Sequence, residues 1–417
     1  MLRSMYSGIS GLKNMQTKLD VIGNNVANVN TYGFKKSRVT FSDTMNQTIS
    51  GASAATANKG GTNAKQVGLG STIATIDTIH TQSSLQNTNR DLDVAISGDG
   101  YFVVKSGDAE FYTRAGNFYL DDNGTLVNSD GLKVQAYKVD EEGNVSNEYG
   151  DVAVNVNALL PATATNEINF TENLSSDSVD GSVFTQQIKV VDEKGIPHAT
   201  TVYFKKTSSN NWDIFINQNP DDPKVTANKV HSIAFDTNGK ITDATKTKDL
   251  TEISTGREDD TSTTAVDESK LTIKLKLDFS ELTQNKGTTT ALVQPNGYTE
   301  GKLESFNFGS SGEINGVYSN GLVKTLGQLA IAKFSNSSGL TKAAGNTFQE
   351  SINSGTADIG VAGNGRGTLR SGSLEMSNVD LSEEFTEMIV AQRAFQSNTR
   401  IITTSDEILQ ELVNLKR

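Results

Sequence analysis

Apolar residues recur at steps of three and four along the amino-terminal segment of the chain. They are Leu2, Met5, Ile9, Leu12, Met15, Leu19, Ile22, Val26 and Val29. This spacing places them on one face of a helix, near the period of a coiled-coil seam. Gly8, Gly11 and Gly23 each weaken the helix by about 1 kcal/mol relative to Ala. The pattern therefore predicts an amphipathic helix that needs a partner to be stable.

The carboxy-terminal segment carries a second helical pattern. Asp380 and Glu383 have the spacing of a capping box, which predicts a helix start near Leu381. A first set of apolar residues then follows 4-3 steps: Leu381, Phe385, Met388, Phe395, Ile402, Leu409 and Val413. A second stripe occupies neighbouring faces: Ile389, Ile401, Ile408, Leu412 and Leu415. A helix with extra stripes can pack against several neighbours.

Two amphipathic helices at opposite ends of a chain have two interpretations. One is an ordinary helical hairpin inside a globular core. The other is an assembly core, which the extra apolar stripes and the β-rich sequence between the helices favour. In an antiparallel pair, a basic group would approach an acidic one: Lys35, Lys36 and Arg38 on one side, and Asp380, Glu383 and Glu384 on the other. The acidic residues also suit a helix start through the helix dipole alone.

Strand patterns dominate the sequence between the helices. Short apolar runs are bounded by turn signals such as Gly98-Asp99-Gly100 and Asp121-Asp122-Asn123-Gly124. Strict alternation marks one run: Leu271, Ile273, Leu275, Leu277 and Phe279. We predict an α+β, mainly β chain with these parts: a helical polymerisation core at 1–30 and 375–417, an extended connector at 31–70, a split β domain at 71–145 and 286–374, and an inserted outer β domain at 146–285.

Composition excludes several classes of protein. The formal net charge of −12 argues against a nucleic-acid partner, which would require a basic face. The absence of cysteine excludes disulfides and thiolate metal sites. No stretch approaches the roughly 20 apolar residues of a membrane span, and the amino terminus lacks the continuous apolar core of a cleavable signal peptide. We expect no membrane insertion and no use of the general secretion pathway.

Three stretches of sequence resemble the bacterial flagellar rod and hook proteins. The first comprises residues 7–12 (SGISGL) and 24–35 (NNVANVNTYGFK). The second comprises residues 378–381 (NVDL), 384–389 (EFTEMI) and 392–398 (QRAFQSN). The third, residues 92–102 (LDVAISGDGYF) with 114–118 (RAGNF), is similar to the shared β domain of that family. The resemblance covers both ends and both halves of the split domain, but not 146–285.

The resemblance implies a structural subunit of the flagellar hook. Such subunits self-assemble into a flexible curved tube, a universal joint that transmits motor torque from rod to filament. It further implies these partners: other copies of the chain, the distal rod protein, the hook cap, the hook–filament junction proteins and the flagellar type III export apparatus. The implied location is outside the cell, in the hook and basal body. The alternative within the family is a distal rod subunit. A secreted carbohydrate-binding protein, with Trp212 and Tyr203 on a sugar-binding face of 146–285, is the alternative from another class.

No motif in the sequence supports catalysis, a cofactor or a metal. His80, His198 and His231 are far apart and lack ligand spacing. Asp121-Asp122-Asn123-Gly124 resembles the start of a calcium loop but has no Glu at the expected distance, so a plain turn is favoured. Trp212, the only tryptophan, lies in an alternating run typical of a core strand. We therefore expect no enzyme, and the candidate site is the apolar polymer interface of the two helices.

Overall fold

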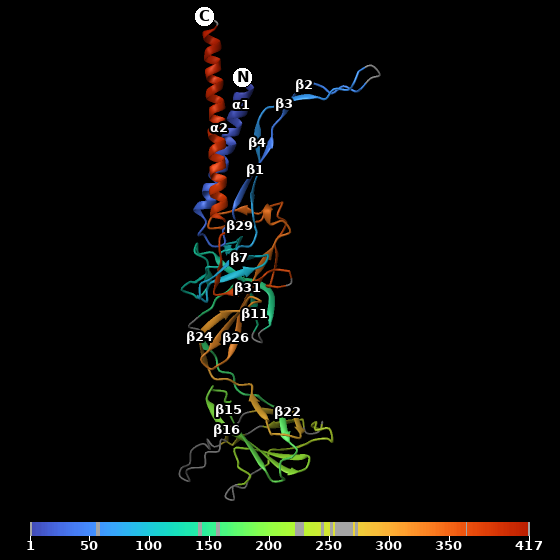
Figure 1. Cartoon of the computed structure of the whole chain (residues 1–417). Helices are drawn as coiled ribbons and strands as arrows, with labels where there is room; N and C mark the ends of the chain where they lie inside the picture. Colours follow the sequence, from blue (N-terminus) through green and yellow to red (C-terminus); the bar gives the residue numbers. More distant parts are fainter. Residues whose placement is uncertain are drawn as a thin grey trace. The chain divides into compact units, whose positions relative to one another are not determined.

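The chain forms two compact units, one of which contains both chain ends. A computed structural model describes residues 2–55, 59–140, 144–155, 159–221, 229–242, 246–250, 253–254, 270–271, 274–363 and 365–415. Unit 1 comprises residues 1–155, 306–316 and 324–417, and unit 2 comprises 156–305 and 317–323. The chain passes between the units at 155–156, within β24 (Gly301–Phe308), within β25 (Glu313–Tyr318) and within β26 (Val323–Leu329). Figure 1 shows the order of the elements along the chain.

Both predicted helices are present in unit 1. The first, α1, covers Leu2–Ala27, and the second, α2, covers Leu381–Asn414. They lie side by side (Figure 1). Helix α2 begins where the capping signal placed it, because the Asp380 carboxylate accepts hydrogen bonds from the backbone N–H groups of Ser382 and Glu383. The prediction of two paired terminal helices is confirmed.

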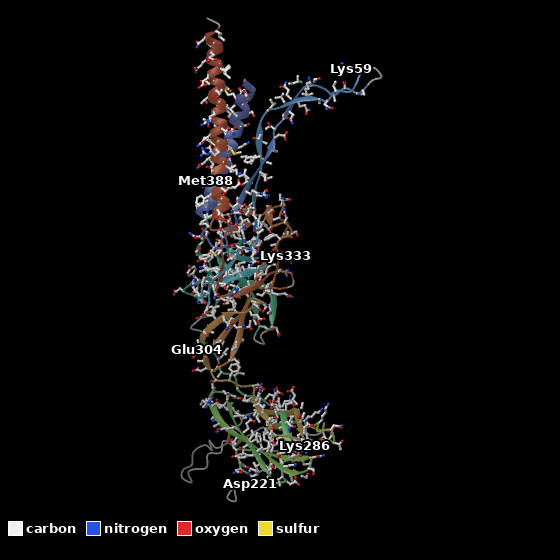
Figure 2. The ribbon with its side chains drawn as sticks, viewed as in Figure 1. Lys59, Asp221, Lys286, Glu304, Lys333 and Met388 are labelled. Atoms are coloured by element: carbon white, nitrogen blue, oxygen red, sulfur yellow. The ribbon has the colours of Figure 1, made fainter. Side chains whose placement is uncertain are left out.

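The region predicted as a connector is a two-stranded antiparallel arm. At its base, β1 (Ser37–Asp43) pairs with β4 (Ser71–Thr78). Further out, β2 (Asn46–Ser50) pairs with β3 (Lys65–Gly68), and an isolated bridge joins Ser53 to Thr62. The side chains of β2 and β3 are all exposed. Lys59 marks the outer part of this arm in Figure 2.

The remainder of unit 1 is a β platform. Its main sheet contains β7 (Tyr101–Ser106), β8 (Ala109–Thr113), β9 (Tyr119–Leu120), β10 (Leu126–Val127), β11 (Lys133–Val139), β12 (Val145–Asp151), β26 (Val323–Leu329), β27 (Ile331–Lys333), β28 (Thr341–Lys342), β29 (Thr347–Gln349) and β30 (Asp358–Gly360). Two short pairs adjoin it: β5 (Leu85–Asn87) with β32 (Ser373–Glu375), and β6 (Val94–Ser97) with β31 (Thr368–Ser371). Tyr101, Tyr112, Phe334 and Phe348 are part of its apolar core.

Unit 2 contains two four-stranded sheets that share one core. The first sheet contains β14 (Glu167–Ser175), β19 (Thr247–Leu250), β22 (Leu275–Asn285) and β23 (Leu292–Pro295). The second contains β15 (Val183–Val191), β16 (Pro197–Ser208), β17 (Asn211–Ile216) and β18 (His231–Ala234). Three short strands lie outside these two sheets: β13 (Leu159–Leu160) pairs with β24, and β20 (Ile253–Ser254) pairs with β21 (Lys270–Leu271).

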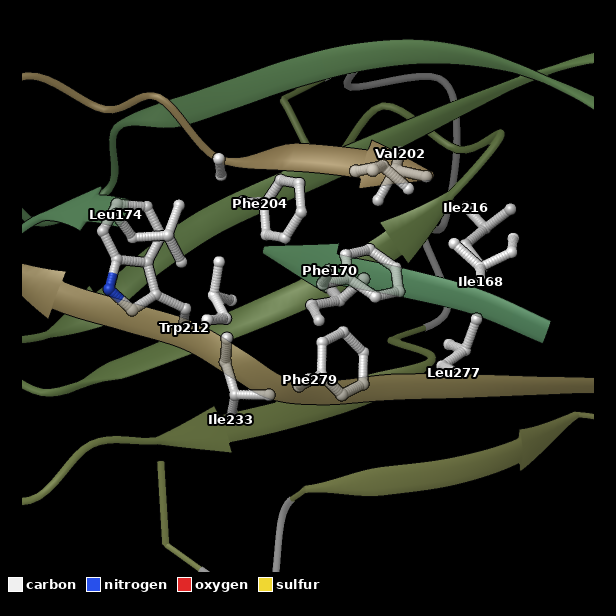
Figure 3. Close-up of a cluster of buried hydrophobic side chains, with 14 of the residues drawn as sticks. Ile168, Phe170, Leu174, Val202, Phe204, Trp212, Ile216, Ile233, Leu277 and Phe279 are labelled. Atoms are coloured by element: carbon white, nitrogen blue, oxygen red, sulfur yellow. The ribbon is translucent and has the colours of Figure 1, made fainter. Parts of the chain in front are cut away.

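Aromatic and aliphatic side chains from both sheets fill the core of unit 2 (Figure 3). Trp212 is 1% exposed and lies in this core, as its alternating run predicted. A sugar-binding face that uses Trp212 is therefore excluded. Leu275, Leu277 and Phe279 are buried, which confirms that part of the alternating strand; Leu271 and Ile273 lie outside the described side chains.

Candidate functional site

Helices α1 and α2 run antiparallel. Near the end of α1, the Asn25 side-chain amide donates to both carboxylate oxygens of Glu384, each at 3.2 Å. Closer to the middle of α1, the Lys18 ammonium pairs with the Glu387 carboxylate. Near the start of α1, a Cβ placed on Gly8 would lie 3.5 Å from Cγ1 of Ile402. These contacts fix the register of the pair along most of α1.

The face of α2 that packs on α1 alternates apolar side chains with small or polar ones. Apart from the half-buried Ala394, its buried and half-buried residues follow 4-3 steps: Glu384, Met388, Ala391, Phe395, Asn398, Ile402, Ser405 and Leu409. Four of these were in the predicted first set, and Met388 is labelled in Figure 2. The other predicted members of that set, Leu381, Phe385 and Val413, are exposed in the single chain. The seam is therefore rotated by part of a turn from the one that the apolar residues predicted.

Two of the glycines in α1 allow the helices to approach closely. A Cβ on Gly11 would lie 2.8 Å from Nδ2 of Asn398, and Gly8 packs beside Ile402. A Cβ on Gly23 would meet no atom of the described residues within 4 Å, so Gly23 serves no packing role among them. Glycine lowers the stability of the helix at all three positions. Among the described residues, only Gly8 and Gly11 offset this loss by allowing close packing against α2.

Several apolar side chains of both helices remain exposed outside this seam or at its edge. On α2 the exposed ones include Leu381, Phe385, Ile389, Val390, Ile401, Ile408, Val413 and Leu415. On α1, Ile9 and Tyr6 are exposed. The other predicted residues of α1 are half-buried (Met5, Leu12, Met15, Leu19 and Val26) or buried (Ile22). The side chains of Leu2 and Leu412 lie outside the described part of the chain.

A buried ion cluster lies below the helices, where both chain ends enter the platform. The Lys35 ammonium donates to Glu375 Oε1 at 2.6 Å and to the Thr81 carbonyl at 2.8 Å. Arg114 Nη1 donates to Glu375 Oε2 at 3.2 Å. The side chains of Lys35 and Glu375 are 0% exposed, and that of Arg114 is 3% exposed. We call these three residues the root cluster.

The backbone conformation at Gly33 allows the Lys35 side chain to reach the root cluster. Gly33 has φ +68°, and a Cβ there would lie 2.6 Å from the backbone of Arg114 and Ala115. Its N–H donates to the Glu375 carbonyl at 2.8 Å. Only glycine satisfies both the left-handed φ and this close approach. The 31–35 motif (TYGFK), the 114–118 motif (RAGNF) and the segment before α2 therefore meet at one point.

His80 adjoins the root cluster and is held neutral. Its Nδ1 lies 2.7 Å from the Tyr101 hydroxyl, and its ring packs against Phe348. Burial, followed by the charges of Lys35, Arg114 and Lys342, lowers the pKa of His80 to about 4. Burial also lowers the pKa of Lys35, against the opposing effect of Glu375. The surroundings of the cluster thus disfavour additional positive charge.

The predicted approach of basic and acidic residues at the helix ends is partly right. Lys36 pairs with Glu383 at 2.6 Å, as expected. Arg38 instead lies 3.5 Å from Asp77 on the paired strand, and Lys35 binds Glu375. Asp380 is used as the cap of α2. Glu375 was not among the predicted residues, since a carboxylate in a short strand carries no local signal of burial.

Other chemistry is not assembled in the part of the chain that the structure describes. Among those residues, no three His, Asp or Glu side chains are grouped so that they could hold a metal ion. Within the same ranges, no helix combines the length and the apolar content needed to cross a membrane. Asp121 Oδ1 accepts from the N–H groups of Asn123 and Thr125, which is the plain turn that was predicted.

The segment after α1 and the segment before α2 meet at one buried cluster, and both helices keep apolar side chains exposed. These features indicate a subunit of a larger assembly. Three family models match the chain: "Flagella basal body rod protein" at 5–35, "Flagellar hook protein FlgE/F/G D1 domain" at 95–243, and "Flagellar basal body rod FlgEFG protein C-terminal" at 370–415. The chain belongs to the flagellar rod and hook protein family, whose members are structural proteins rather than enzymes.

Full-length relatives include both hook and rod proteins. The flagellar hook protein FlgE of Treponema pallidum is 37% identical over 100% of both chains. The flagellar basal-body rod protein FlgG of Bacillus subtilis is 40% identical over 100% of both chains. The FlgE hook protein of Escherichia coli is 35% identical over 98% of each. The crystal structure of the Helicobacter pylori hook protein FlgE2 has a similar fold, with a TM-score of 0.51 at 13% identity, over 70% of this chain and 100% of that one.

Proposed function

We propose that this chain is the repeating subunit of a flagellar hook. It self-assembles through its terminal helices into a flexible curved tube that transmits torque from rod to filament. The observation that supports this most strongly is the row of apolar side chains on α2 that α1 leaves uncovered. A subunit that functioned alone would gain nothing from such a row.

The uncovered residues of α2 form two stripes suited to neighbouring helices. Leu381, Phe385 and Ile389 follow one another at steps of four. Ile401, Ile408 and Leu415 recur every seven residues, which is the repeat of a coiled-coil seam. Burying one such side chain is worth about 1.5–3 kcal/mol. Contacts along both stripes would supply enough free energy to hold helices of adjacent subunits together.

The arm offers a second contact surface between subunits. Met45, Ile49, Val67 and Leu69 are exposed, and pairing places Met45 beside Leu69. An isolated two-stranded ribbon is at best marginally stable in water. We infer that this apolar face packs on an adjacent copy, in a contact that can adjust as the tube bends.

The finer assignments follow from the hook hypothesis. We propose that the helices line an export channel, that residues 71–145 and 286–374 form the split domain and 146–285 an outer domain, and that the tube lies outside the cell. The distal rod protein, the hook cap and the junction proteins would be its partners at the two ends, and the flagellar type III apparatus would export it.

A distal rod subunit is the second candidate, because a relative named as a rod protein matches the full length. Length therefore does not separate the two functions. The location of the protein does: antibodies against unit 2 would label a curved segment outside the cell envelope if the chain forms the hook, and the basal body within the envelope if it forms the rod.

Electron microscopy of concentrated protein tests self-assembly. We expect the full chain to form tubes, and a variant that lacks residues 1–30 to remain as soluble β units. A Gln396→Ser variant is the matched control, because Gln396 is an exposed polar residue of α2. Tubes formed by the truncated variant would contradict the proposed role of the helices.

A further inference from the structure

The segment that leads into α2 contacts two other segments at the root cluster. On one side, the Gly33 N–H donates to the Glu375 carbonyl, and the Lys36 N–H donates to Asn378 Oδ1 at 2.7 Å. On the other side, the Met376 N–H donates to the Ser84 carbonyl at 3.0 Å, and Asn378 Nδ2 donates to the Ile79 carbonyl at 2.8 Å. Residues 373–378 therefore contact both segments. The two segments also meet directly, where the Lys36 carbonyl accepts from the Ile79 N–H at 2.9 Å.

The charges of the root cluster distinguish the two chain segments. Glu375 is the carboxylate that contacts Lys35 and Arg114. The Ser83 N–H also donates to Glu375 Oε1 at 3.0 Å, and the Arg114 guanidinium lies 5.2 Å above the Tyr101 ring. Without Lys35, Glu375 and Arg114 remain a neutral pair. Without Glu375, two buried cations face each other with no carboxylate between them.

We propose that the root cluster imposes an order on the folding of the two chain segments: residues 373–378 dock first, through Glu375 and Arg114, and residues 33–36 dock second, because the buried Lys35 ammonium has a carboxylate partner only when Glu375 is in place. The inference concerns contacts within one chain, so it does not depend on whether the assembly is a hook or a rod.

The physical basis is that removing one partner of a buried ion pair costs more free energy than removing both partners. A buried charge whose partner is removed keeps its full desolvation cost, whereas a pair that stays intact is close to neutral in free energy. The lowered pKa of Lys35 shows that burial already disfavours this cation even with Glu375 present. Docking of the amino-terminal segment before the carboxy-terminal one would leave Lys35 and Arg114 uncompensated.

Hydrogen exchange of two backbone amides in the full-length chain tests the order. The Gly33 N–H reports docking of the amino-terminal segment, and the Met376 N–H reports docking of the carboxy-terminal one. In the unmodified chain both amides are protected; lack of protection there would overturn the proposal. Lys36→Met is the matched control, since Lys36 adjoins Lys35 but pairs with the exposed Glu383. It should leave both amides as in the unmodified chain.

The two partners of the cluster give different expected results. Glu375→Gln should accelerate exchange at both amides, by about 100-fold, as removal of one partner of a buried pair implies. Lys35→Met should accelerate Gly33 alone. Equal acceleration of Met376 exchange by Lys35→Met and Glu375→Gln would overturn the order of docking.

The double variant distinguishes the proposed charge effect from a simple loss of packing around Lys35 and Glu375. Adding Lys35→Met to Glu375→Gln removes one uncompensated cation, so protection of Met376 should recover relative to Glu375→Gln alone. Additive losses in the double variant would contradict the proposal. If Glu375→Gln alone does not fold, folding of the double variant decides: a folded chain supports the proposal and an unfolded one overturns it.

Discussion

Gly33 gives the sharpest test of how the chain ends are held in the platform. Gly33→Ala would place a Cβ 2.6 Å from backbone atoms of Arg114 and Ala115, which cannot move as a side-chain tip can. The left-handed φ of +68° adds strain for any residue with a Cβ. Strain of about 1 kcal/mol and overpacking of about 1–3 kcal/mol predict a total loss of roughly 2–4 kcal/mol.

Gly23→Ala is the matched control in the same chain. Gly23 lies in α1, and no atom of the described residues lies within 4 Å of its Cβ position. Alanine there should stabilise the helix by about 0.5–1 kcal/mol. The same change at two glycines ten positions apart along the sequence is thus expected to act in opposite directions.

Calorimetry together with tryptophan fluorescence separates the effects on the two units. The single tryptophan, Trp212, is in the core of unit 2, so its fluorescence follows that unit alone. For Gly33→Ala we expect the transition of unit 1 to fall by about 5–10 °C, while the Trp212 transition stays unchanged. A transition of unit 1 within about 1 °C of the unmodified chain would refute the account of the junction at Gly33.

Two further predictions concern the pH response and the assembly surface. The pKa of His80 is about 4 in the folded chain and about 6.5 in the unfolded chain. Between these pH values His80 is therefore protonated in the unfolded chain and neutral in the folded chain. The stability contribution is complete above pH 6.5 and is lost as pH falls towards 4, so unit 1 should lose about 2 kcal/mol between pH 7 and pH 5. Chemical denaturation at the two pH values measures this loss; an equal loss in His80→Gln would assign it to another group. At the end of α2, replacing the exposed Ile408 and Leu415 together by Ser should leave the melting of the free chain unchanged and raise the protein concentration needed for tubes by about 100-fold or more, since about 3 kcal/mol or more of burial is lost. Sedimentation of polymers against concentration measures it, and an unchanged threshold would show that this stripe stays uncovered.

The elements that a local signal marks were predictable from the sequence. The cap at Asp380 fixes the start of α2 because its carboxylate acts on the next two or three N–H groups along the chain. The Lys36–Glu383 pair was among the contacts expected for an antiparallel pair of helices, although the sequence left their orientation open. The alternation of Leu275, Leu277 and Phe279 predicts their burial because a strand has period two.

The root cluster could not be predicted, because its parts are brought together only by the fold. Lys35 and Glu375 are separated by 340 residues. Neither residue differs in local sequence from a lysine or glutamate at a surface. The left-handed glycine in the 31–35 motif was visible as a glycine, but the backbone that it approaches, at Arg114 and Ala115, comes from a distant turn. The pairing of the arm strands was missed because their side chains are exposed and polar residues separate the few apolar ones.

The seam of α2 shows why apolar periodicity alone does not define the contact with α1. Each large residue of the real seam, such as Phe395 or Ile402, is followed by a small or polar one, such as Asn398 or Ser405. Such a seam buries little apolar surface within one chain, so we expect the pair to be marginal before assembly. Far-UV circular dichroism of the free chain should show less helix than the 26 and 34 residues of α1 and α2 would give, and the helical signal should rise on polymerisation. A free chain in dilute buffer with the full helical signal would mean that the inner seam is sufficient, and that the outward stripes serve another purpose.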